Sequence, residues 1–128
     1  MIFQILWVKA FRGICKEYLI IQAKKNLLFI SYYIGKWWET NLLLKKQDDV
    51  DVLALDKAHT KAIFMECKFT SSPMPLEEYE DLLNATKAFP KVKEKYLYFI
   101  SKSGFTEPVK RQAEIDHAVL LSIDDLFI

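Results

Sequence analysis

Cysteine is scarce in this chain of 128 residues, which contains only Cys15 and Cys67. The two cysteines form neither a Cys-x-x-Cys pair nor a cluster with histidine, so the sequence offers no structural zinc site. Two isolated thiols are typical of a reducing compartment, and we therefore expect a cytoplasmic protein.

Glycine is scarce as well, and no long uncharged run occurs. Gly13, Gly35 and Gly104 lie far apart, which excludes a Gly-rich phosphate loop and a dinucleotide-binding fingerprint. No segment approaches the roughly 20 uncharged residues that a membrane span requires. The apolar start soon meets Lys9 and Arg12 and has no small-residue cleavage site, so we expect neither a membrane anchor nor a signal peptide.

Apolar residues, in contrast, are plentiful. Hydrophobic residues make up 52% of the chain and charged residues 27%, a composition that supports a packed core. The formal net charge is only +1, so the overall charge indicates no particular class of partner. A chain of this length suits one domain, and we expect residues 1–128 to form a single unit.

The hydrophobic pattern changes between helical and strand periods along the chain. Helical spacing is present over 3–22 and again from near Pro75 to Pro90, a helix that Ser72 is expected to cap. The remaining segments predict strands at 26–38, 49–56, 62–70, 95–101 and 118–124, and a short helix at 107–117. The order α-β-β-β-α-β-α-β predicts an α/β fold whose mixed central sheet is flanked by helices on both faces.

Two opposite charges lie inside an almost wholly apolar strand, in the stretch AIFMECKFT at 62–70. Glu66 and Lys68 are two residues apart, so they share one face of the strand. Cys67 lies between them and faces the other way, where we expect a helix to cover it. This pair is either an ion pair kept for structure or a part of an active site.

A third charged residue is expected to join this pair. In the preceding strand Asp51 faces away from Val50 and Val52, and in a hairpin it would lie beside Glu66 at roughly 5 Å. Two carboxylates at that separation repel each other unless a cation lies between them. Mg²⁺ or Mn²⁺ suits such oxygen ligands, and the backbone carbonyl of Cys67 would supply one more.

This set of residues is suited to phosphodiester hydrolysis in nucleic acid. A metal held by Asp51 and Glu66 would activate water and neutralise charge on a phosphate. Lys68 would orient that water or stabilise the transition state. We therefore predict Asp51, Glu66 and Lys68 as catalytic residues.

The same motifs resemble a known family. The stretch DVDVLALD, followed ten residues later by ECK, resembles the PD-(D/E)XK nuclease superfamily, whose core order is αβββαβ. More narrowly, ISYYIGKWWE, DVDVLALD, FMECKFT and FISKSGF resemble in order a domain of unknown function, type 234, that follows an ATPase module in archaeal and bacterial ATPases. The resemblance implies a restriction-endonuclease-like fold and a Mg²⁺-dependent activity on nucleic acid, with DNA favoured. It implies metal ligation by Asp51 and Glu66, and the role of the superfamily lysine for Lys68.

Two departures from that family leave alternatives open. Phe11 and Arg12 stand where the family has Phe-Glu, and an arginine near a metal would compete with it for the carboxylates. The chain also has no P-loop, so it lacks the ATPase module. The second hypothesis is therefore a catalytically inactive nuclease-fold module that binds DNA or a partner protein. The third is a structural domain whose apolar N-terminal helix pairs with an ATPase or with a second copy, as a homodimer.

The other charged residues carry no specific prediction. The lysine clusters in KKNLL, LKKQ and KVKEK are expected to be solvated edges, as is Lys87, although together they could form a weakly basic rim. His59 and His117 are isolated from other residues that could act with them.

Overall fold

The computed structural model describes residues 10–11, 13–18, 20–21, 33–41 and 46–122, except for the side chains of 36–41 and 46–49. The described residues between 10 and 21 are helical. They are followed by β1 (Tyr33–Asn41), β2 (Lys46–Leu55), β3 (Lys61–Lys68), α2 (Leu76–Ala85), the short 3-10 helix η1 (Thr86–Ala88), β4 (Glu94–Ser101), α3 (Glu107–Asp116) and β5 (Val119–Ser122). The predicted order of helices and strands is confirmed; residues 26–32 of the first expected strand and 123–124 of the last lie outside the described residues.

The five strands form one mixed sheet in the order β1-β2-β3-β4-β5. The pairs β1–β2 and β2–β3 are antiparallel, whereas β3–β4 and β4–β5 are parallel. Antiparallel neighbours are joined by short turns, while parallel neighbours need a crossover, which α2 and α3 provide. The sheet is therefore mixed because its first three strands follow one another directly, whereas a helix precedes each of the last two, as the predicted order requires.

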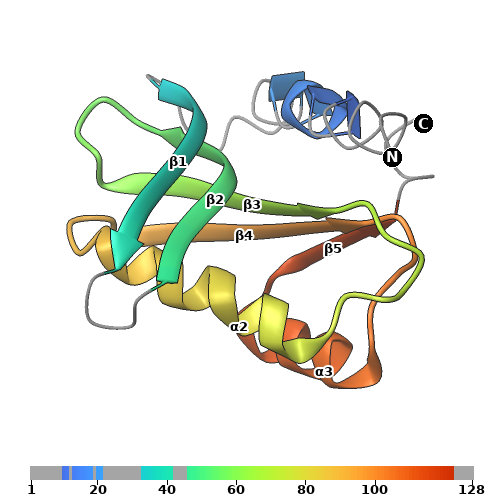
Figure 1. The fold of residues 1–128 in the computed structure, drawn as a ribbon. Coiled ribbons are helices and arrows are strands. Elements are labelled where there is room, and N and C mark those ends of the chain that lie inside the picture. The colour runs from blue at the N-terminus through green and yellow to red at the C-terminus, as the bar shows by residue number, and fades with distance from the viewer. Residues whose placement is uncertain (1–9, 12, 19, 22–32, 42–45, 123–128) are drawn as a thin grey trace.

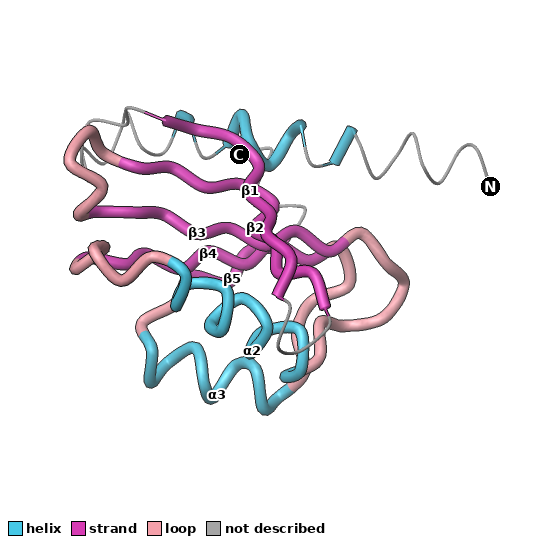
Figure 2. The backbone as a smooth tube through the Cα atoms, turned by 60° about the vertical axis from the view of Figure 1, so that its left-hand side comes forward, coloured by secondary structure: helices cyan, strands magenta, loops and turns pink. Residues whose placement is uncertain are grey.

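Helices cover both faces of the sheet. Helices α2 and α3 lie on one face and the N-terminal helical residues on the other (Figures 1 and 2). Between that face and helices α2 and α3 lies one core cluster, which contains Phe64 of β3, Tyr79 of α2 and Phe99 of β4. The opposite face buries Phe11 and Cys15 of the N-terminal helix with several residues of the sheet in a second cluster. Burial of both faces explains why the central strands are almost wholly apolar.

Helix α2 begins without the predicted side-chain cap. Pro75 precedes its first residue, and no side chain bonds to the first amides. Ser72 lies earlier in the chain, where its carbonyl accepts a hydrogen bond from the Thr70 hydroxyl, so the prediction that Ser72 caps the helix is wrong. Glu77 and Glu78 do occupy the first turn, where the helix dipole favours carboxylates.

None of the helices formed by the described residues is long and apolar enough to cross a membrane.

Candidate metal and nucleic-acid site

Strand β2 changes its pairing at the position of Asp51. The register with β1 shifts by one residue between Gly35 and Trp37, which leaves Asp51 and Val52 opposite a single residue of β1. A bulge of this kind breaks the alternation of side chains and bends the strand. Val50 accordingly packs into the cluster under α2, while Val52 packs into the opposite cluster. The prediction that Val50 and Val52 share a face is therefore wrong.

The carboxylate of Asp51 bonds to the neighbouring strand. Strands β2 and β3 pair as the predicted hairpin, and their ladder ends at Val52 and Met65, one residue before Asp51 and Glu66. Oδ2 of Asp51 accepts a hydrogen bond from the backbone N–H of Cys67 at 2.9 Å. Asp51 is only 6% exposed. The structure therefore brings Asp51 to the part of β3 that carries the Glu-Cys-Lys motif.

Lys68 has a partner that sequence reasoning missed. Its Nζ lies 2.5 Å from Oε1 of Glu78 in the first turn of α2, and the two side chains are 16% and 39% exposed. Both residues belong to the βα unit in which α2 crosses back over the sheet after β3. The sequence signal for this contact was the pair of acidic residues, Glu77 and Glu78, in the first turn of α2. This charge-assisted hydrogen bond ties the end of β3 to α2.

The side chain of Cys67 is directed to the other face of the sheet. It packs against the cluster that contains Phe11 and Cys15, as the alternation of the strand predicted. A hydrogen bond with the Cys15 thiol raises the pKa of the Cys67 thiol far above its usual range, and burial and the charges of Asp51 and Glu66 act in the same direction. The thiol is therefore protonated at neutral pH, so the metal ligand that Cys67 can offer is its carbonyl oxygen.

The end of β4 borders Lys68. Ser101 pairs with Lys68 in the parallel register and is fully buried, and its hydroxyl has no hydrogen-bond partner within the described part of the chain. The N–H of Lys102 donates to the carbonyl of Lys68 at 3.0 Å. The ammonium of Lys102 lies over the ring of Phe69, 4.6 Å from the ring centroid. Gly104 then turns the chain with a φ of +83°.

The donor atoms at this site fit Mg²⁺. Among the residues that the structure describes, no three histidine, cysteine, aspartate or glutamate side chains are arranged to hold a metal. Mg²⁺ commonly takes only one or two carboxylates and completes its shell with water and substrate phosphate. Asp51, Glu66 and the Cys67 carbonyl would make a set of that kind, and this stays a prediction. Arg12 lies outside the described residues.

These features define an α/β domain with a mixed five-stranded sheet and a candidate acidic site at β2 and β3. A family model described as archaeal and bacterial proteins of unknown function, DUF234, matches residues 3–80. The match covers more than half of the chain, which therefore belongs to this family, as the resemblance in the sequence predicted.

Two solved structures are similar to this chain. One is a protein of unknown function, AF1548, with a TM-score of 0.48, 16% identity, and coverage of 82% of this chain and 55% of that chain. The other is a repair endonuclease from Pyrococcus abyssi, with a TM-score of 0.45, 12% identity, and coverage of 85% of this chain and 46% of that chain. The chain thus spans about half the length of each. No curated protein matches the sequence.

Proposed function

We propose that this chain is a nuclease-like domain of the PD-(D/E)XK type that hydrolyses phosphodiester bonds in nucleic acid with the help of Mg²⁺ or Mn²⁺. The observation that carries the proposal is the placement of Asp51. A bulge in β2 and a hydrogen bond to β3 set its nearly buried carboxylate beside the strand that carries Glu66 and Lys68. A bulge near a functional site commonly serves to aim one side chain.

Each residue has a separate role in this proposal. Asp51, Glu66 and the carbonyl of Cys67 would hold the metal. A bound Mg²⁺ supplies positive charge at the phosphate. Lys68 would orient the attacking water or stabilise the charge that develops on the phosphate, an effect that is stronger in a partly buried position. Glu78 would keep the Lys68 side chain at the edge of the site.

One observation favours a second candidate function. The ammonium of Lys68 is already bonded to Glu78. If Lys68 stays there, the pair links β3 to α2 and does not assist a reaction. The chain would then be an inactive nuclease-fold module that binds DNA or a partner protein.

Calorimetric titration with Mn²⁺ tests the first proposal without a known substrate. The variants are Glu66→Gln and, as a matched control, Glu77→Gln, which removes the same charge from an exposed side chain in the first turn of α2. We expect saturable binding by the wild type and by Glu77→Gln, and at least about tenfold weaker binding by Glu66→Gln, because one of the two carboxylate ligands is lost.

The other results exclude parts of the proposal. Absence of binding by the wild type would rule out the metal site and favour the inactive module. Equal binding by Glu66→Gln and the wild type would remove Glu66 from the ligands.

The remaining expectations stay predictions. They are a preference for DNA, an ATPase module that acts with this chain, a homodimer, a cytoplasmic location, and a single domain over residues 1–128.

A further inference from the structure

Lysines gather at the end of the sheet remote from the candidate metal site. The turn from β2 to β3 and the segment from η1 into β4 lie side by side, because the amides of Lys93 and Glu94 both donate to the carbonyl of Thr60. Figure 1 shows this end on the left, whereas the ends of β3 and β4 that border the candidate site point to the right. We call it the lysine-rich end; it comprises Lys57, Lys61, Lys87, Lys91, Lys93 and Lys95.

The local charge of this end is strongly positive. Residues 56–61 and 86–95 contain six lysines and two carboxylates, Asp56 and Glu94, a surplus of four positive charges in a chain whose total is only +1. Neither carboxylate forms an ion pair with a lysine there. Asp56 accepts hydrogen bonds from Thr60 and the Lys61 amide, and Glu94 accepts one from a tyrosine hydroxyl. None of the six lysines forms an ion pair in the described part of the chain, and the ammonium of Lys95 donates to the carbonyl of Thr86 at 3.4 Å.

The backbone under these lysines is held in one conformation. The Asp56 carboxylate accepts from the amides of both Thr60 and Lys61, at 2.8 and 3.1 Å, which closes the turn. His59 in that turn has a φ of 58°, a left-handed conformation that few residues other than glycine adopt. Because this backbone is already ordered, less conformational entropy is lost when a ligand binds.

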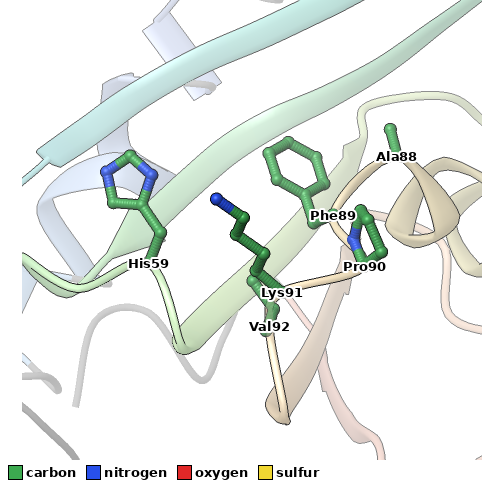
Figure 3. Close-up of a pocket in the computed structure, with 6 residues that line it drawn as sticks. All are labelled: His59, Ala88, Phe89, Pro90, Lys91 and Val92. Carbon is green, nitrogen blue, oxygen red and sulfur yellow. The ribbon is translucent and has the colours of Figure 1, made fainter.

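A small pocket opens within the lysine-rich end. It has a volume of about 190 Å³ and is lined by His59, Ala88, Phe89, Pro90, Lys91 and Val92. In Figure 3 the Lys91 side chain extends between the His59 ring and the Phe89 ring. The volume is below the 300–1,000 Å³ that is usual for drug-sized ligands. Phe89 packs edge-on against Phe64 of the core, so the group in the pocket that bears on nucleic acid is the Lys91 ammonium, which can contact a backbone phosphate.

We propose that the lysine-rich end binds the phosphate backbone of nucleic acid. The inference deepens the proposed function, since it rests on nucleic acid as the substrate and names a second surface that contacts it. Along β3, Lys61 of this end and Glu66 of the candidate site are five residues apart, roughly 17 Å at about 3.3 Å per residue. A substitution at one site therefore leaves the groups of the other in place.

Fluorescence anisotropy with a labelled 20-base-pair DNA duplex in EDTA tests the proposal, because chelation keeps metal out of the candidate site. The test variant is Lys91→Gln with Lys93→Gln. The matched control is Lys110→Gln with Arg111→Gln, two exposed cations on α3. Each pair removes two positive charges, so the net charge of the two variants is the same.

We expect the Lys91/Lys93 variant to bind about tenfold more weakly near 50 mM salt. The slope of log K against log salt should fall in magnitude by about 1.8, because each lost phosphate contact removes about 0.9. The control should retain both affinity and slope. Absence of binding by the wild type, or an equal loss in both variants, would overturn the proposal. Because Mn²⁺ binding is measured separately, a lysine-dependent DNA affinity in a chain that binds no metal would uphold this surface and reject the cleavage site.

Discussion

Replacement of Asp51 by alanine tests whether the bulge in β2 holds a carboxylate against β3. Oδ2 of Asp51 accepts the Cys67 N–H at 2.9 Å in a position that is 6% exposed. Alanine leaves this amide without that acceptor. A hydrogen bond to a charged group contributes about 1.5–3 kcal/mol, and an unsatisfied buried donor costs about 1–3 kcal/mol. We therefore expect Asp51→Ala to lower the free energy of unfolding by about 2–3 kcal/mol.

Asparagine at the same position separates the hydrogen bond from the charge. Asp51→Asn keeps an oxygen acceptor of the same shape, so the loss from a weaker hydrogen bond is about 1 kcal/mol. It also removes one negative charge from the proposed pair with Glu66, which would relieve repulsion of similar size. We expect the unfolding free energy of Asp51→Asn to stay within about 1 kcal/mol of the wild type, while its Mn²⁺ binding is lost with the ligand.

Urea unfolding followed by circular dichroism measures both variants. Glu80→Ala serves as the control, because Glu80 is exposed on α2 and its removal should change the free energy by no more than about 0.5 kcal/mol. Wild-type stability in Asp51→Ala would refute the argument, since the contact with Cys67 would then contribute nothing. A loss in Asp51→Asn as large as in Asp51→Ala would show that the charge, rather than the acceptor, stabilises this position.

Three further predictions concern other parts of the fold. The hydrogen bond with Cys15, together with burial, raises the pKa of Cys67 from its usual 9.0, so the folded state holds the thiol proton more tightly than the unfolded state. The resulting stability is present below about pH 9 and decreases above it, by up to about 1.4 kcal/mol per pH unit. Urea unfolding at pH 8 and pH 10 measures this loss. The unfolding free energy of Cys67→Ala should decrease less between the two pH values than that of the wild type. His117 ends α3 with a φ of 56°, so His117→Gly should raise the unfolding free energy by about 0.5–1 kcal/mol; a thermal melt in which His117→Ala gains as much would contradict this explanation. Glu78→Gln should cost about 0.5–1 kcal/mol, a value reduced by the exposure of the Glu78 side chain, and urea unfolding that shows no change would mean that the bond to Lys68 contributes no stability.

The ends of the elements show where sequence patterns lose precision. The first two strands were expected to end at 38 and to begin at 49, but β1 continues to Asn41 and β2 begins at Lys46. Asn41 and Lys46 pair across the antiparallel hairpin. Backbone hydrogen bonds hold such residues in the ladder even though their side chains are polar. Hydrophobicity alone therefore makes the two strands of a hairpin too short at the turn.

The sequence by itself determined the order of helices and strands and the burial of both faces of the sheet. Each of these depends on the spacing of residues close together in the chain, which sets the faces of a helix or strand. Only the tertiary structure decided the bulge at Asp51, the contact of Lys68 with Glu78, and the gathering of lysines at one end. These depend on how β1 pairs with β2, how α2 crosses back over the sheet, and which turns meet at one end of the strands. Such contacts join residues far apart in sequence, and no local pattern encodes their register.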